Sequence, residues 1–399
     1  MRETKTILLI NDHIHFGGGG DAALQFEKRH LENLGFEVIC IGFGEEEIIK
    51  HPFYVIAIPS NPKIEKLSKF FFSGNIEKKF TELIKKIKPD LIHIHLISKF
   101  PLSVYNSPAL KKLPVIQTLH GPNLFCSTSW GGLKSSGSCE LRSGIKCFTR
   151  GCTNAASAFL YWQMQEKYWK SLNNTIDLFH CPSLNIFNSA KRLGFKNSTY
   201  IPLAIDEVFL EVPIPKKIER PTLLYVGAMA EQKGVQFLLP ALKKIKKSFP
   251  NILLRLAGRG LMLPKLKKES VDLNLEENIE FLGFVPHEEI REFYLSGNIF
   301  LMPSIWQEQF GLVGPEALAC EVPCIGSNVG GIPEWLRHNE NGFLVPPQEI
   351  DPLVEAIVDL LSNHQKRIAF GQNGRKMVLK EFGPDLYKNN IEEMIKSLL

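Results

Sequence analysis

Short apolar runs alternate with longer amphipathic stretches along most of the chain, a pattern typical of strands joined by helical crossovers. In the first half, apolar runs bounded by polar or turn residues predict strands at residues 6–11, 38–42, 55–58, 91–95, 115–119, 178–180 and 199–201. Amphipathic stretches predict helices at residues 22–34, 77–88 and 155–172. Short buried strands that alternate with helices indicate a parallel, doubly wound α/β sheet.

The pattern stops at residues 211–221 and then restarts. This segment holds three prolines among charged residues, a composition typical of a linker. Beyond it, strands are predicted at residues 223–226, 253–257, 279–282, 299–302, 324–325 and 343–345. The chain ends on a predicted amphipathic helix at residues 382–399. Two Rossmann-like halves joined by a hinge predict a ligand site in a cleft between them.

The composition is that of a soluble globular protein with two domains. The 399 residues are 44% hydrophobic and 22% charged, which is an ordinary balance for such a protein. Because the sequence has no apolar run of about 18 residues and no apolar signal segment, we expect a cytoplasmic protein.

The net charge of +5 is unevenly distributed. Residues 1–200 hold 25 Lys and Arg against 16 Asp and Glu, a net charge of +9, and the remainder holds 22 against 26, a net charge of −4. A basic first half favours an acidic acceptor or an anionic membrane surface. A solvated face without a partner is the alternative.

Four of the eight cysteines fall in one Gly- and Ser-rich segment, at Cys126, Cys139, Cys147 and Cys152. Their spacing contains no Cys-x2-Cys pair, so the usual zinc pattern is absent. A metal site, disulfides and unconnected thiols all remain open for these four residues.

A loop between a predicted strand and a predicted helix carries two carboxylates. Glu308 follows the strand at residues 298–302, and Glu316 lies in the first turn of the next helix. In an open parallel sheet such a loop lies at the carboxyl end of the strands, where ligands bind. The N–H groups of residues 311–314 would suit a phosphate there. The arrangement favours a nucleotide-sugar site, the alternatives being a helix-capping Glu316 and a solvated Glu308.

The whole string from Pro303 to Ala317, Pro-Ser-x3-Glu-x-Phe-Gly-Leu-x3-Glu-Ala, resembles the signature of glycosyltransferase family 4. These enzymes are retaining transferases of the GT-B fold, α/β proteins with two Rossmann-like doubly wound domains facing a cleft. The resemblance implies an acceptor-side domain at 1–208 with a Cys-bearing loop at 122–152. It implies a nucleotide-sugar-binding domain at 209–381 and a terminal helix at 382–399 that packs back on the first domain.

The resemblance also implies roles for particular residues. Glu308 would hold sugar hydroxyls as a catalytic residue, and Glu316 would hold the ribose. Lys233, in a loop similar to the family's Gly-Arg-x4-Lys-Gly loop, would bind the donor diphosphate. The amides of Gly311 and Leu312 would assist it. The remaining donor-binding positions implied by the family are Gly18, Gly19, Val285, Phe310 and Val313.

One loop departs from the family pattern. Ala228 stands where the family has an arginine. Arg259, which follows the next predicted strand, is a candidate replacement for the missing charge, and an exposed surface role is the alternative. The segment at residues 330–334 resembles the family's Gly-Gly-x-Pro-Glu turn, which is either structural or ligand-binding.

Three features of the first half also resemble the family. Four glycines at residues 17–20 precede a helix, where backbone can approach a ligand closely; a flexible loop is the alternative. His120 ends a predicted strand, and the family carries a histidine there against the transferred sugar. A histidine satisfied within its loop is the alternative. His93 and His95 end another strand and resemble the family's His-x-His, with packing at the sheet edge as the alternative.

The resemblance implies a retaining, metal-independent glycosyltransferase with a nucleoside-diphosphate sugar donor and a glycan or polyprenyl-phosphate-linked acceptor. It implies no cofactor, no metal and no nucleic acid. Such enzymes serve cell-surface polysaccharide, lipid-linked oligosaccharide or glycoprotein glycan synthesis. The alternatives are a nucleotide-sugar epimerase or phosphorylase of the same fold, and an inactive glycan- or nucleotide-binding relative, which Ala228 suggests.

A basic and aromatic segment predicts contact with a membrane. Lys63, Lys66 and Lys69 recur at three-residue spacing beside three consecutive Phe at residues 70–72. Apolar insertion combined with attraction to anionic lipid is what an interfacial contact requires. We therefore expect a peripheral protein on the inner face of the cell membrane. The alternative places the Phe side chains in the core and leaves the lysines solvated.

Overall fold

The computed structural model describes residues 4–12, 19–44, 48–57, 74–95, 104–105, 107–121, 144–212 and 218–399. The chain divides into two compact units. The first unit comprises Met1–Leu203 together with Tyr387–Leu399, and the second comprises Ala204–Leu386. Within the described ranges, no helix combines the length and the apolar character needed to cross a lipid bilayer.

The first unit contains one sheet in the order β3-β4-β2-β1-β5-β6-β7-β8. Its strands are β1 (Thr6–Ile10), β2 (Glu37–Gly44), β3 (Ile48–Lys50), β4 (Phe53–Ala57), β5 (Leu91–Ile94), β6 (Val115–Thr118), β7 (Leu178–Cys181) and β8 (Ser198–Tyr200). Seven of these strands are parallel, and β3 pairs with β4 in the antiparallel sense. All seven predicted strands are present, whereas β3 was not predicted.

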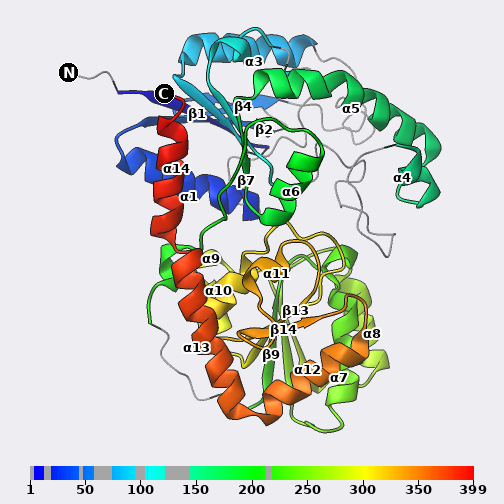
Figure 1. Ribbon diagram of the computed structural model, residues 1–399. Helices are drawn as coiled ribbons and strands as arrows, with labels where there is room; N and C mark the ends of the chain where they lie inside the picture. Colours follow the sequence, from blue (N-terminus) through cyan, green and yellow to red (C-terminus); the bar gives the residue numbers. More distant parts are fainter. Residues whose placement is uncertain are drawn as a thin grey trace. The chain divides into compact units, whose positions relative to one another are not determined.

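Helices cover both faces of this sheet. They are α1 (Gly19–Asn33), α3 (Gly74–Ile87), α4 (Ile145–Thr149), α5 (Ala155–Thr175), α6 (Leu184–Arg192) and part of α14 (Pro384–Lys396). The apolar faces of α3, α5 and α6 pack on the sheet in one core, which includes Phe80 and Phe179. The helices α3 and α5 lie on one side of the sheet, and α1 with α14 on the other (Figure 1). The ring of Phe26 on α1 meets that of Tyr387 on α14 edge to face, at 5.6 Å between centroids.

The second unit contains a fully parallel sheet in the order β11-β10-β9-β12-β13-β14. Its strands are β9 (Thr222–Val226), β10 (Leu253–Ala257), β11 (Ile279–Gly283), β12 (Ile299–Met302), β13 (Cys324–Ser327) and β14 (Gly342–Val345). All six predicted strands are present. Two sheets of mainly parallel strands with helical crossovers confirm the predicted α/β, doubly wound fold class.

The helices of the second unit also form two layers (Figure 1). They are α7 (Leu238–Ile245), α8 (Leu263–Asp272), α9 (His287–Tyr294), α10 (Val313–Ala319), α11 (Ile332–Trp335), α12 (Ile350–Ser362) and α13 (His364–Glu381). Leucine and isoleucine side chains of α7, α8 and α12 pack against the strands in a second core. The two cores explain why the interruption near residues 211–221 separates two folding units.

The direction of winding reverses at one point in each sheet. In the second unit the chain proceeds from β9 through β10 to β11 on one side, and from β12 through β13 to β14 on the other. In the first unit the reversal lies between β1 and β5. Loops that leave the carboxyl ends of the strands at such a reversal separate from each other and leave room for a ligand. The loops after β9 and β12 are therefore the expected binding loops of the second unit.

Candidate active site

The loop after β9 rests directly on the loop after β12. The short 3-10 helix Glu231–Lys233 ends on Gly234, whose φ of +69° is left-handed. A Cβ atom on Gly234 would lie 1.8 Å from the carbonyl oxygen of Pro303. The N–H of Ile305 donates to the carbonyl of Gln232 at 3.0 Å. This backbone contact fixes Lys233 beside the loop that carries Glu308.

Lys233 and Glu308 form an ion pair in the second unit. The Nζ of Lys233 donates to Oε1 of Glu308 at 2.6 Å, and the Oγ of Ser304 donates to the same oxygen at 2.7 Å. Glu308 is buried, and the Nζ of Lys233 also lies 4.9 Å from the centroid of the Trp306 ring. The structure therefore joins two residues for which the family resemblance implied separate roles. A buried carboxylate requires such donors, because its charge is costly to remove from water.

Two glycines in the loop after β13 pack against the backbone of Glu308. Gly330 has a φ of +56°, and a Cβ there would lie 2.1 Å from the carbonyl oxygen of Glu308. The N–H of Gly331 donates to the same carbonyl at 2.8 Å. The Gly-Gly-x-Pro-Glu turn thus packs against the backbone of Glu308. This contact agrees with a structural role for the turn, one of the two roles that the sequence left open.

Glu316 lies at the start of α10 and is half-buried. Its Oε2 accepts a hydrogen bond from the hydroxyl of Tyr294 at 2.9 Å. Burial raises the pKa of Glu316 above its ordinary value, and the bond from Tyr294 acts in the opposite direction. Its second carboxylate oxygen can accept hydrogen bonds from a ligand hydroxyl.

The residues between the two glutamates divide into core and backbone positions. Phe310 is buried, and its carbonyl accepts from Nε1 of Trp335 at 2.6 Å. Gly311 has a φ of +83°, and a Cβ there would lie 2.4 Å from Cε of Met302. Within the described residues, the N–H groups of Gly311 and Leu312 donate to no backbone carbonyl. Leu312 is the N-cap residue of α10 and Val313 its first residue, so these amides lie at a helix N-terminus, the end of a helix that favours an anion.

The loop with Ala228 is joined to the loop with Arg259. The N–H of Met229 donates to the carbonyl of Arg259 at 2.8 Å. Arg259 is exposed, and its guanidinium carbon lies 5.7 Å from the centroid of the Phe284 ring. Val285, next to Phe284, is half-buried. Both Arg259 and Val285 thus follow strands at the carboxyl edge of this sheet, as Lys233 does.

In the first unit, His120 follows β6 and meets a buried partner. Its Nε2 lies 3.0 Å from Nδ1 of His95, and the two rings stack with centroids 5.3 Å apart. Burial is the main cause that keeps the pKa of His120 well below its ordinary value. His120 is therefore a neutral imidazole near pH 7.

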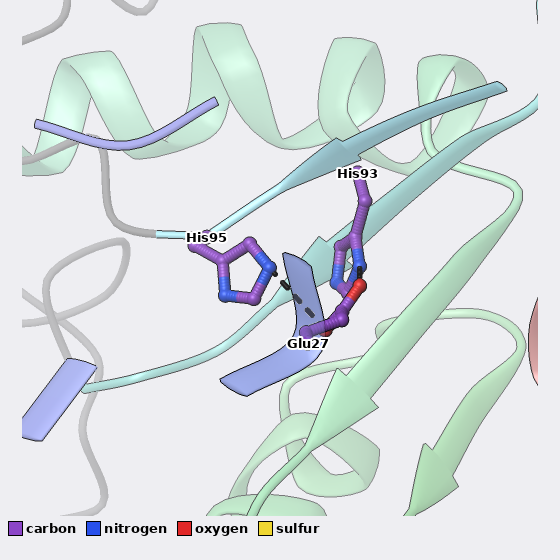
Figure 2. Close-up of side chains that lie close together, drawn as sticks. All are labelled: Glu27, His93 and His95. Carbon is purple, nitrogen blue, oxygen red and sulfur yellow. Dashed lines mark hydrogen bonds and ion pairs between the residues drawn. The ribbon is translucent and has the colours of Figure 1, made fainter. Parts of the chain in front are cut away.

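The sequence analysis did not identify Glu27, whose side chain contacts His93 and His95 in the interior of the first unit. Its carboxylate contacts Nδ1 of His93 at 2.5 Å and Nε2 of His95 at 3.4 Å (Figure 2). Glu27 lies on α1 and is fully buried. The only sequence signal was the position of an acidic residue on the inward face of a helix, which requires a cationic or donating partner.

Several predicted positions lie outside the described residues. They are Gly18, Lys63, Lys66, Lys69, Cys126 and Cys139. Gly19 is the first residue of α1. Cys147 lies in α4, and the N–H of Cys152 donates to the Cys147 carbonyl at 2.9 Å.

Comparison with known proteins agrees with this architecture. A family model described as Glycosyltransferase Family 4 matches residues 17–209, and one described as Glycosyl transferases group 1 matches residues 210–377. The two matches meet at residues 209 and 210, close to the boundary between the units at Leu203 and Ala204.

Individual relatives show the same likeness. An uncharacterized glycosyltransferase of Methanocaldococcus jannaschii is 27% identical over 335 residues, which cover 77% of this chain and 91% of that protein. A GDP-mannose-dependent alpha-(1-6)-phosphatidylinositol monomannoside mannosyltransferase of Mycobacterium tuberculosis is 28% identical over 184 residues. The match covers 45% of this chain, and the chain spans about half the length of this curated relative, 48%.

A solved structure has the same fold. The Anabaena protein HepE, in complex with UDP-glucose, superposes with a TM-score of 0.73 at 18% identity, and the match covers 98% of this chain and 100% of HepE. Two doubly wound units of this kind define a protein of the GT-B class. The two models together span residues 17–377, and the chain belongs to the glycosyltransferases of group 1 and family 4.

The contact at Gly234 predicts a large loss of stability on substitution. Gly234→Ala should lower the melting temperature more than Gly283→Ala does. Both glycines have a left-handed φ, +69° and +71°, so each alanine costs about 1 kcal/mol in backbone strain. Only position 234 adds a clash with backbone, since a Cβ on Gly283 meets no atom within 4 Å. Overpacking of that kind costs about 1–3 kcal/mol more. Equal melting temperatures for the two variants would contradict the packing of these loops.

Proposed function

We propose that this protein is a retaining glycosyltransferase that moves a sugar from a nucleoside-diphosphate sugar to a glycan or lipid-linked acceptor. The observation that carries the proposal is the cluster of Ser304, Glu308 and Lys233 at the point where the second sheet reverses its winding. A carboxylate for sugar hydroxyls and a cation for phosphate thus lie side by side. The family supports the reaction class, and the M. tuberculosis relative, by its name, depends on GDP-mannose.

Each residue of the cluster has a role that its chemistry allows. Glu308 accepts hydrogen bonds from sugar hydroxyls, as a catalytic residue, while Ser304 keeps its carboxylate in place. Lys233 turns its ammonium toward the diphosphate, whose negative charge grows as the bond to the sugar breaks. The amides of Gly311 and Leu312 stabilise the same charge, and Glu316 accepts from the ribose.

The reaction needs no separate base in this proposal. The acceptor hydroxyl attacks from the face that the diphosphate leaves, and the leaving phosphate oxygen takes the proton of that hydroxyl. The configuration at the transferred carbon is therefore retained. His120, which the family places against the transferred sugar, contacts it as a neutral imidazole. Protein cations and amides stabilise the leaving group, so the proposal includes no catalytic metal.

The acceptor and the location follow from charge. The basic first half, with a net charge of +9 over residues 1–200, supports an acidic acceptor such as a polyprenyl-phosphate-linked glycan. We place the enzyme in the cytoplasm, peripherally at the inner face of the cell membrane, in the synthesis of a cell-surface, lipid-linked or protein-linked glycan.

One observation favours a second function. Ala228 removes a cation that the family uses for the donor diphosphate, so a nucleotide-binding relative without transferase activity is the competing proposal. Such a protein would bind a nucleoside diphosphate and release no nucleotide with any pair of donor and acceptor.

A thermal-shift screen of nucleotide sugars tests the donor. A donor present at 100 times its Kd should stabilise the protein by about 2.7 kcal/mol. The matching nucleoside diphosphate should produce a smaller shift, because it lacks the contacts of the sugar with Glu308. If no UDP-, GDP-, ADP- or dTDP-sugar raises the melting temperature at millimolar concentration, the proposed function is wrong.

Substitution of Lys233 tests the role of the cation. Lys233→Ala should lower kcat/KM by about 10²-fold or more, which is the scale of losing one donor to a charged transition state. Lys268→Ala is the matched control, because Lys268 is an exposed lysine of the same unit paired with Asp272. The melting temperature of each variant shows whether the unit still folds. Turnover like that of the unsubstituted protein in a folded Lys233→Ala variant would exclude the diphosphate role.

Arg259 is proposed to supply part of the charge missing at Ala228. Arg259→Ala should weaken binding of the nucleoside diphosphate by about tenfold, the scale of one hydrogen bond to a charged group. Ala228→Arg in the same variant should restore the affinity, measured by calorimetry at low and high salt. Lys265→Ala is the control for the change in net charge, because Lys265 is an exposed residue of α8. An unchanged Kd in Arg259→Ala means that Arg259 is a surface residue only.

A further inference from the structure

Five buried polar side chains form a continuous line behind His120. Glu27 lies on α1, His93 on β5 and His95 just after β5, while Thr118 lies on β6 and His180 on β7. All five side chains are at most 1% exposed. None of them has a part in the roles proposed above. Because buried donors and acceptors must be matched, the position of each proton along this line can be worked out from its ends.

The far end of the line is a carbonyl group, which can only accept. His180 therefore donates from Nε2 to the carbonyl of Ile201, at 2.8 Å. Burial lowers the pKa of His180 to about 4, so the ring is neutral near pH 7 and its Nδ1 carries a lone pair. The hydroxyl of Thr118, 2.9 Å away, donates to that Nδ1. The same hydroxyl oxygen then accepts from Nε2–H of His93, at 2.7 Å.

The next contact makes His93 and Glu27 an ion pair. Oε1 of Glu27 lies 2.5 Å from Nδ1 of His93. Burial alone would raise the pKa of Glu27, but the charge of His93 and the hydrogen bonds from His93 and His95 hold that pKa well below its ordinary value. Glu27 is thus a carboxylate, and His93 donates from both of its nitrogens. This pair compensates a charge that would be costly to bury alone.

The carboxylate of Glu27 also determines the protonation of His95. Its Oε2 faces Nε2 of His95 at 3.4 Å, as the dashed lines of Figure 2 show. The one negative charge of Glu27 is already compensated by His93, so we take His95 to be neutral. A carboxylate oxygen favours N–H at Nε2 of His95, which leaves the lone pair of that ring on Nδ1. His120 then donates from Nε2 to this Nδ1 across 3.0 Å. The proton of the His120 ring is consequently on Nε2, and Nδ1 of His120 is the basic nitrogen.

We infer that Glu27 is a positioning residue, which fixes the ring orientation and the tautomer of His120 through His95. The inference rests on the proposed function for the role of His120 toward the donor sugar. A carboxylate that holds a histidine in one tautomer is an established way to prepare that ring for catalysis. Here the histidine His95 stands between the carboxylate and the ring that it controls.

The same residues could be taken for a metal site, since ligand atoms of Glu27, His93 and His95 all lie within 4.8 Å of one another. The spacing argues against this. Metal–ligand bonds of 2.0–2.1 Å in a tetrahedral zinc site place neighbouring ligand atoms roughly 3.3 Å apart. The separation of Oε1 from Nδ1 is 2.5 Å, which is a hydrogen-bond distance. The polar atoms of this pair satisfy each other directly.

Nitrogen NMR of the unsubstituted protein tests the assignment without any variant or substrate. In protein labelled with 15N-histidine, His120 should show a protonated Nε2 and an unprotonated Nδ1, and His93 should show two protonated nitrogens. The His120 resonance is assigned from its loss in His120→Gln. The opposite tautomer at His120 would overturn the inference. So would zinc or another metal bound at one equivalent and lost in Glu27→Gln.

Glu27→Gln tests whether the carboxylate exerts this control. The amide retains the shape of the side chain and removes its charge, so His120 should become a mixture of tautomers. With the donor found in the screen, kcat should fall about tenfold or more while the KM for the donor changes less than about twofold, the scale seen when the partner of a functional histidine is removed. In a His120→Ala background, Glu27→Gln should have no further effect on kcat.

Glu32→Gln is the matched control, because Glu32 lies on the same helix and pairs with Lys28 at its surface. An unchanged His120 tautomer in Glu27→Gln, or an equal loss of kcat with and without His120, would refute positioning. The two proposals fail separately. The tautomer is measured without turnover, so absence of transferase activity with the predicted NMR pattern would refute only the proposed function.

Discussion

The candidate site of the second unit depends on loops that pack backbone against backbone. Gly234 lies on the Pro303 carbonyl, Gly258 on the Gly227 carbonyl and Gly330 on the Glu308 carbonyl, at distances where a Cβ atom would clash. Side chains cannot separate these loops, so the loops after β9, β10, β12 and β13 behave as one piece at the edge of the sheet. Lys233 and Glu308 are therefore oriented by the main chain, which is more rigid than contacts between long side chains.

The first unit achieves a similar result by different means. There the strands carry polar side chains into the interior, and most of them are joined by hydrogen bonds, while Oε2 of Glu27 and Nε2 of His95 approach each other only to 3.4 Å. The ion pair of Glu27 and His93 makes this line stiff, because any rotation of one ring would leave a buried charge without its partner. The second unit thus positions its charged residues by close backbone contacts at glycines. The first unit positions them by a series of hydrogen bonds between side chains.

The sequence was sufficient to predict the parallel strands, because a parallel sheet requires short apolar runs that contrast with their surroundings. It missed β3, whose three residues are too few to show a period, and α6, whose apolar face covers only two turns. It placed His120 and Glu308 at strand ends but could not pair Glu308 with Lys233, 75 positions away. It also missed Glu27, because the pattern of a helix shows which face is buried and does not show what that face meets.

The pairing of Lys233 with Glu308 limits the positive charge that the site can offer to a phosphate group. Lys233 has three ammonium protons, so it can keep one bond to Glu308 and offer the others to a phosphate. Glu308 in turn keeps the hydroxyl of Ser304 when the lysine moves. With alanine at position 228, however, the proposed site has one ammonium for both a carboxylate and a diphosphate. The local charge then stays negative unless amides at the start of α10 or another cation contribute. Under the proposed function, donor binding would therefore depend more on the main chain around Gly311 than it would with an arginine at position 228.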